Sequence, residues 1–168
     1  MTGESPTQKE GLLVVGVGEY KVTRVREAHL VTYALGSCLG VTAHDGKAGV
    51  GGLLHFKLPN SDLNRPMAQS KPGVFGDTGL AFFLQELLGL GATRPQLDLK
   101  LIGGAKSLGP SDFFNIGERN LLLARRFIWM NGLIVSKEET GGGDYRTVRL
   151  EMATGRVTVK DPRGLHEI

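Results

Sequence analysis

The sequence predicts a single α+β domain, and three observations lead to this prediction. The chain has 168 residues, a length typical of one domain. Short apolar runs rich in β-branched residues recur along it, while two longer segments carry apolar residues at the three-to-four spacing of a helix. Hydrophobic residues make up 40% of the chain and charged residues 22%, which is enough apolar material for a core.

Apolar, β-branched runs predict the strands of the N-terminal part. We expect these strands at 12–17, 20–25, 30–35, 39–43 and 50–58. Asp45-Gly46 lies between the last two strands and is a strong signal for a hairpin turn. The eighteen residues 59–76 are polar and rich in Pro, Asn and Ser, so they predict a long surface loop with a functional role.

Two helices and the remaining strands are predicted in the rest of the chain. Asp77 can cap a helix over 77–90, which has an apolar stripe. Asn115 and Glu118 have the spacing of a capping box, and a glycine at position 132 fits the C′ position, so a second helix is expected from about 116 to 131. Strands are expected at 97–102, 133–136, 145–152 and 156–160.

The two ends of the chain are predicted to lie outside the folded domain. The first eleven residues are polar and lack the apolar segment of a signal peptide. No apolar run approaches the length of a membrane span. We therefore expect a flexible N-terminal tail at 1–11, a folded domain at 12–160, a C-terminal tail at 161–168, and a cytoplasmic protein without membrane insertion.

Charge and cysteine content argue against several classes of function. The 20 basic and 17 acidic residues give a net charge of +3 and are scattered, whereas nucleic-acid-binding proteins concentrate Lys and Arg in a stripe. Cys38 is the single cysteine, so the chain forms neither an internal disulfide nor a thiolate metal cluster. We expect no nucleic acid, no metal and no cofactor.

Cys38 is nevertheless a candidate nucleophile because of the residues around it. A lone intracellular cysteine is usually a small, inert, buried side chain. Here it lies in Gly36-Ser37-Cys38-Leu39-Gly40, where the flanking glycines permit a sharp turn that projects the thiol and leaves backbone N–H groups free. The match to a nucleophile elbow is partial, because an elbow leads into a helix and Leu39 begins a predicted strand. The backbone N–H groups of Ser37, Cys38 and Leu39 are candidate oxyanion donors.

A cysteine nucleophile needs a base, and the predicted hairpin selects His55. If Asp45 and Gly46 form a two-residue turn, Leu53 faces Cys38 and His55 is its diagonal neighbour. If the turn spans 45–48, His55 faces Cys38 directly. Either even-length turn places the thiol and the imidazole on one face of the sheet, whereas a three-residue turn separates them.

Other conspicuous residues have simpler explanations. His44 adjoins the turn and is expected to be solvated, His29 precedes its strand and is expected to be structural, and His166 lies in the predicted C-terminal tail. Gly103-Gly104-Ala105-Lys106-Ser107 lacks the glycine pattern of a phosphate-binding loop, so it is predicted to be a strand-to-loop turn.

The residues around Cys38 and His55 resemble the CheD family of chemoreceptor glutamine deamidases. The resemblance begins at 32–41 (TYALGSCLGV) and continues at 51–59 (GGLLHFKLP), which places the cysteine and the histidine seventeen residues apart. Further similar segments are 75–78, 102–105, 116–120 and 154–157. The similarity spans most of residues 12–160. Departures from the family pattern fall at Gly79, Glu139 and Tyr145, outside the residues proposed for catalysis.

The resemblance implies a fold, a reaction and partners. The fold is a mixed β-sandwich with helices packed on one side, similar to the cytotoxic necrotizing factor-type cysteine hydrolases. The reaction is deamidation of receptor glutamine to glutamate through a thioester, with Cys38 as nucleophile, His55 as base and Thr32 as the third member of the triad. His55 either takes the thiol proton during attack or holds Cys38 as a thiolate. The substrate is the cytoplasmic domain of a chemoreceptor, and a CheC-type phosphatase is a further expected partner.

The same resemblance leaves a second class of function open. The fold can act as a non-catalytic regulatory module that engages a CheC-type phosphatase. The two functions differ in whether Cys38 is required for deamidation.

Overall fold

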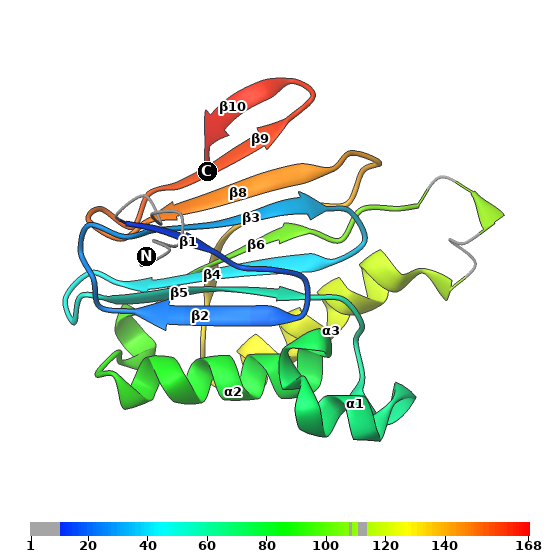
Figure 1. Cartoon of the computed structure of the whole chain (residues 1–168), viewed down its shortest axis with the longest axis horizontal. Coiled ribbons are helices and arrows are strands. Elements are labelled where there is room, and N and C mark those ends of the chain that lie inside the picture. The colour runs from blue at the N-terminus through cyan, green and yellow to red at the C-terminus, as the bar shows by residue number, and fades with distance from the viewer. Residues whose placement is uncertain (1–10, 108, 111–113) are drawn as a thin grey trace, which may run out of the picture.

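The computed structural model of the chain describes residues 11–107, 109–110 and 114–168. The described residues form two five-stranded β-sheets and three α-helices in one domain. Figure 1 shows α2 beneath β2 and β5, with β8, β9 and β10 at the opposite side of the molecule. This helix–sheet–sheet layering confirms the predicted sandwich with helices on one side. The predicted N-terminal tail, apart from residue 11, lies outside the described residues.

The first sheet (sheet A) lies farthest from the helices. Its strands are, in spatial order, β1 (Leu12–Val14), β3 (His29–Leu35), β8 (Arg146–Glu151), β9 (Val157–Asp161) and β10 (Gly164–Glu167). β1 runs parallel to β3, and the other pairs are antiparallel. Residues 161–168, expected to form a tail, contain β10. The carboxylate of Asp161 accepts hydrogen bonds from the Arg163 backbone and guanidinium, which shapes the turn that returns the chain onto β9.

The second sheet (sheet B) lies between sheet A and the helices. Its strands are, in spatial order, β2 (Glu19–Thr23), β5 (Val50–Phe56), β4 (Leu39–Asp45), β6 (Asp98–Gly103) and β7 (Val135–Thr140). β6 and β7 are parallel, and the other neighbours are antiparallel. Every residue of β4 and β5 is buried, because these strands are covered on both faces.

The β4–β5 hairpin has a four-residue loop that lies one residue further along the chain than the four-residue turn considered from the sequence. Asp45 pairs with Val50 and Gly40 pairs with His55, so the loop is residues 46–49. The Asp45 carboxylate accepts from the backbone N–H groups of residues 47 and 48, which stabilises this four-residue loop. Neither Leu53 nor His55 pairs with Cys38, so both predicted registers were wrong, although the predicted even length was correct.

The N-terminal caps of the helices differ from those predicted, although α3 begins at Ile116 as expected. α2 (Gly76–Gly89) has Phe75 at its N-cap position, and Asp77 lies in its first turn instead, where it accepts hydrogen bonds from the Ser61 backbone and hydroxyl. α3 (Ile116–Met130) starts after Asn115 without a side-chain capping bond, so the predicted capping box is absent. Gly132 does occupy the C′ position with φ +68°.

The segment 59–76 is more ordered than the predicted loop. It contains the short helix α1 (Arg65–Ser70) between two 3-10 turns, Ser61–Leu63 and Pro72–Val74. The Asn64 side chain accepts a hydrogen bond from the Met67 backbone and caps α1. Asp77 holds the start of this segment against α2 through Ser61, as described above.

Two apolar layers result from this arrangement, one on each face of sheet B. The layer between sheet B and the helices includes Leu39, Leu54, Phe56, Phe83, Leu101 and Ala124. The layer between the two sheets includes Leu30, Leu35, Leu53, Ile102, Val148 and Leu150. Successive residues of β5 alternate between these layers, as strand geometry requires. His55 therefore projects towards sheet A.

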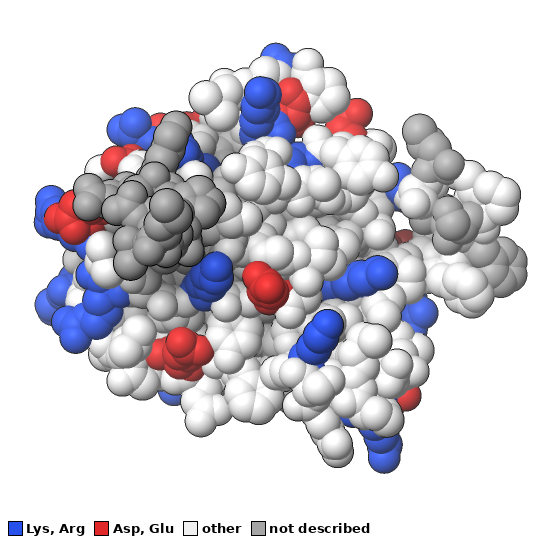
Figure 2. Space-filling model, in the orientation of Figure 1, with Lys and Arg blue, Asp and Glu red and all other residues white. Residues whose placement is uncertain are grey.

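On the face shown in Figure 2, Lys and Arg side chains are interspersed with Asp and Glu, and no basic stripe is visible. Among the described residues, no helix is both long and apolar enough to cross a membrane.

Candidate active site

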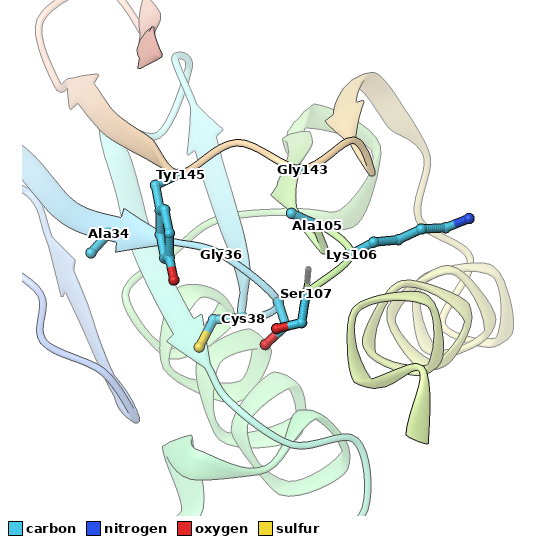
Figure 3. A pocket seen from close by; sticks show the side chains of 9 residues that line it. Ala34, Gly36, Cys38, Ala105, Lys106, Ser107, Gly143 and Tyr145 are labelled. Carbon is cyan, nitrogen blue, oxygen red and sulfur yellow. The ribbon is translucent and has the colours of Figure 1, made fainter. Parts of the chain in front are cut away.

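Cys38 is half-buried in the loop between β3 and β4 and faces a pocket of about 450 Å³. The pocket is lined by Ala34, Gly36, Ser37, Cys38, Ala105, Lys106, Ser107, Gly143 and Tyr145. Figure 3 shows the Cys38 thiol near the Tyr145 ring, while Lys106 points away from them. The sulfur is therefore accessible to a side chain that enters the pocket.

Three hydrogen bonds hold the loop that carries Cys38. The carbonyl oxygens of residues 36, 37 and 38 accept, in turn, from the Ala105 N–H at 2.9 Å, the Asn120 amide at 3.0 Å and the Gly104 N–H at 2.8 Å. No peptide bond among the described residues is cis, so each N–H points opposite to the carbonyl of its own peptide. The amides of residues 37 and 38, two of the predicted oxyanion donors, therefore point away from the groups that hold the loop, whereas the Leu39 N–H faces β5, where Leu39 pairs with Phe56.

Glycines at the end of β6 allow this close approach. Gly103 has φ +107°, and a Cβ there would lie 2.5 Å from the Cys38 carbonyl oxygen. At the start of α3, a Cβ on Gly117 would lie 2.4 Å from the Ala105 carbonyl oxygen. Segment 103–107 is thus the strand-to-loop turn that the sequence predicted, and it packs against the Cys38 loop.

Thr32 and His55 are brought together across the two sheets. The Thr32 hydroxyl donates to the Val15 carbonyl at 2.7 Å, and its oxygen lies 2.7 Å from His55 Nδ1. A hydroxyl has a single hydrogen, so Thr32 must accept from the His55 Nδ1–H. The Val15 carbonyl thereby fixes the tautomer in which His55 Nε2 carries a free lone pair.

His55 is fully buried, and its surroundings keep it neutral. Burial lowers the pKa of His55 to about 4, because the charged imidazolium is poorly solvated there. Burial likewise raises the pKa of the Cys38 thiol, and the nearby Lys57 ammonium acts in the opposite direction with a smaller effect. Both shifts favour a neutral thiol beside a neutral imidazole.

Cys38 and His55 lie on the same side of sheet B. Cys38 packs against the apolar layer between the sheets, and His55 projects into that layer to meet Thr32. Gly40, which pairs with His55, has no side chain to crowd the ring. His55 Nε2 is buried and makes no hydrogen bond to any described residue. A direct Cys38–His55 hydrogen bond is therefore not formed, as is common for catalytic pairs before substrate binds.

The remaining histidines lie outside this site. His44 was expected to be solvated, but it is buried, and its Nε2 lies 3.0 Å from the Met152 carbonyl. His29 is the first residue of β3. His166 Nε2 lies 2.7 Å from a Glu139 carboxylate oxygen.

One group of described side chains has the composition of a metal site. Ligand atoms of Glu139, Asp161 and His166 all lie within 4.8 Å of one another. Arg163 pairs with both carboxylates, at 2.5 Å from Asp161 and 3.2 Å from Glu139. The guanidinium supplies the positive charge that a metal ion would bring, so the group forms an ion-pair network.

Sequence reasoning missed two residues that shape the site. Asn120 was noticed only as part of a family segment, yet its amide holds the Cys38 loop. The available signal was a polar amide on the apolar face of α3, between Gly117 and Leu121. Tyr145 was noted only as a departure from the family pattern. Tyr145 lines the pocket. Its ring packs closely on Gly36, where a Cβ would lie 2.8 Å from a ring atom.

Known proteins resemble this chain over most of its length. The family model described as CheD chemotactic sensory transduction matches residues 57–161. The probable chemoreceptor glutamine deamidase CheD 1 of Syntrophus aciditrophicus is 42% identical, over 92% of this chain and 96% of that protein. Probable chemoreceptor glutamine deamidases CheD from Solibacter usitatus and Pyrococcus abyssi are 39% and 41% identical, over 89% and 87% of this chain and 88% and 89% of theirs.

A solved structure is also similar in part. A Neisseria meningitidis protein with the family model DUF152 aligns with a TM-score of 0.42 and 15% identity, over 79% of this chain and 63% of that one.

Proposed function

The chain belongs to the CheD family, and we propose that it is a cysteine hydrolase that deamidates glutamine side chains of methyl-accepting chemotaxis receptors. The products are glutamate and ammonia, and the substrate is the cytoplasmic domain of the receptor. The observation that carries the proposal is the Thr32–His55 hydrogen bond, formed on the face of sheet B against which Cys38 also packs.

The proposed reaction begins with proton transfer from Cys38 to His55. The Nε2 lone pair takes the Sγ proton, and the sulfur attacks the carboxamide carbon of a receptor glutamine. Backbone N–H groups of residues 37 and 38 hold the oxyanion that forms. Protonated His55 then gives its proton to the departing nitrogen. Ammonia leaves, and the glutamine side chain remains bound to Cys38 as a thioester. Water, deprotonated by His55, hydrolyses the thioester and restores the thiol.

The electrostatics of the site support proton transfer during attack over a preformed thiolate–imidazolium pair. Burial raises the pKa of Cys38 and lowers the pKa of His55, so the resting pair is neutral. Thr32 is a neutral partner and lacks the charge with which a carboxylate would stabilise an imidazolium. His55 therefore becomes charged only transiently.

The proposal is tested by mass spectrometry of receptor cytoplasmic peptides incubated with wild-type protein, Cys38→Ala and His55→Asn. We expect conversion of glutamine to glutamate by the wild type and none above background by either variant. His166→Asn is the matched control, because it removes a histidine outside the pocket, and it should convert at the wild-type rate. If the wild type binds receptor or a CheC-type phosphatase without converting glutamine, the regulatory-module function replaces the enzyme.

A further inference from the structure

Asn120 joins the two segments that carry Cys38 and His55. It lies on α3, and its side chain is fully buried. Its amide nitrogen donates to the Ser37 carbonyl at 3.0 Å and to the Lys57 carbonyl at 3.0 Å. An amide nitrogen carries two hydrogens, so both of its donors are used.

The two carbonyl groups have defined relations to the proposed chemistry. The Ser37 carbonyl shares a planar trans peptide with the N–H of Cys38, so the bond from Asn120 fixes the direction of that N–H. Lys57 follows His55 by two residues, just after β5 ends. One side chain therefore sets both the orientation of a candidate oxyanion donor and the separation between the nucleophile loop and the strand of the base.

The same side chain has a feature that packing alone does not explain. The Asn120 Oδ1 is buried and makes no hydrogen bond to any described residue. A buried acceptor without a donor destabilises the folded state. The other buried positions of α3 are apolar or glycine: Gly117, Leu121, Ala124 and Ile128. At position 120, both N–H groups of the amide are therefore hydrogen-bonded, whereas its carbonyl oxygen is not.

We propose that Asn120 is a positioning residue for deamidation, which aligns the Cys38 N–H and holds the Cys38 loop at a fixed distance from His55. The inference rests on the proposed deamidase function. It does not make Asn120 a substrate ligand, because the side chain is buried and does not line the pocket. Its loss therefore affects the chemical step and leaves substrate binding nearly unchanged.

The test compares Asn120→Asp with wild type by steady-state deamidation of a receptor peptide. Aspartate has nearly the same shape but lacks the amide donors. Loss of one oxyanion donor lowers kcat by roughly 100- to 1000-fold in well-studied hydrolases. Because Asn120 acts through the backbone, we expect kcat to fall about 10- to 100-fold, with KM within about twofold of wild type. Asn131→Asp is the matched control: Asn131 follows the same helix and donates to the Phe127 carbonyl, away from the site, so its kcat should not change.

Circular dichroism and thermal unfolding establish that each variant is folded at the assay temperature. If Asn120→Asp does not fold, Asn120→Ser, which keeps one hydroxyl donor, is measured by the same criteria. A kcat within twofold of wild type, a loss confined to KM, or failure of both variants to fold would overturn the proposal. A wild-type protein that converts no glutamine counts against the proposed function instead, before any variant is compared.

Discussion

At the scale of single residues, the direction of the Thr32–His55 hydrogen bond determines what His55 can do. The Val15 carbonyl accepts the Thr32 hydrogen, so the Thr32 oxygen accepts from Nδ1 and leaves Nε2 able to take a proton. The sequence resemblance suggested Thr32 as the third triad member. The hydrogen bond from Thr32 to the Val15 carbonyl was not predictable, because every residue has a backbone carbonyl and the residue type does not reveal which one accepts.

Replacing Thr32 with valine tests this arrangement. Valine has the shape of threonine but cannot accept from Nδ1, so the neutral imidazole loses its preferred tautomer and its fixed orientation. We expect deamidation kcat to fall about 10- to 100-fold in Thr32→Val, less than the roughly 100- to 10,000-fold that general acid–base catalysis contributes, because His55 itself remains. Thr32→Ser keeps the hydroxyl and should retain most activity. Equal rates for Thr32→Val and wild type in the peptide assay would show that the hydroxyl does not orient the base.

Buried His55 also predicts how stability depends on pH. Burial lowers its folded-state pKa to about 4, whereas an unfolded histidine has a pKa near 6.5. Between these values the unfolded state binds a proton that the folded state does not, so stability falls as pH falls from about 6.5 to about 4. At about pH 4.5 the loss from this residue alone is about 2–3 kcal/mol.

Urea unfolding at about pH 7 and pH 4.5 measures this contribution. The difference between the two pH values should be smaller in His55→Gln than in wild type by about 2 kcal/mol. His166→Gln serves as a control for a histidine outside the buried site. The same pH dependence in wild type and His55→Gln would contradict a buried neutral imidazole.

At the scale of elements, the site depends on how strand ends and loops meet. The sequence predicted the strands on either side of Cys38, the strand that carries His55 and the even length of the hairpin loop. It did not predict the register, because the Asp45 carboxylate bonds to two backbone N–H groups and thereby stabilises a four-residue loop. Alternation along a strand fixes the face of a side chain, whereas local side-chain bonds choose between registers of the same parity.

Gly103, the last residue of β6, gives a prediction at this scale, and Gly91, which follows α2, is its control. The backbone φ angles of Gly91 and Gly103 are nearly the same, +108° and +107°, so Gly91→Ala and Gly103→Ala each add a Cβ to a similar backbone conformation. The Gly91 position has no atom within 4 Å of that Cβ, while the Gly103 position brings it to 2.5 Å from the Cys38 carbonyl oxygen. Gly91→Ala therefore measures backbone strain alone, of about 1–3 kcal/mol.

Gly103→Ala should be less stable than Gly91→Ala by at least about 1 kcal/mol, because the Cys38 loop must also move. It should also lose deamidation activity at temperatures where it is folded, while Gly91→Ala stays active. Thermal unfolding and the peptide assay provide both comparisons. If the two alanine variants are equally stable and equally active, the close packing of β6 on the Cys38 loop is not needed for the site.

At the scale of the whole molecule, the sandwich explains why the site could be predicted only in part. Periodicity and turn signals predicted the α+β class and most strands, because those signals are local. The segment 161–168 was expected to be a tail, since Gly164–Glu167 contains a single large apolar residue, Leu165, yet these four residues pair with β9. Asn120 bonds to residues 37 and 57, which are 83 and 63 positions away, and Thr32 bonds to His55, 23 positions away. Such long-range pairs form only when the layers are assembled.

The residues of the proposed site come from different layers of the molecule. Sheet A supplies Thr32, sheet B supplies His55, and α3 supplies the amide that holds the loop of Cys38. His55, the proposed base, is thus buried between the sheets, while Cys38, the proposed nucleophile, faces the pocket. This division keeps His55 neutral and its tautomer fixed without closing access to the sulfur.

The most direct test of the account is to follow a receptor peptide by mass spectrometry with hydroxylamine present, using wild type and Cys38→Ala. Hydroxylamine intercepts a thioester, so the wild type should yield a hydroxamate at the target glutamine, and Cys38→Ala should leave that glutamine unchanged. Conversion of the glutamine by Cys38→Ala at the wild-type rate would contradict the account.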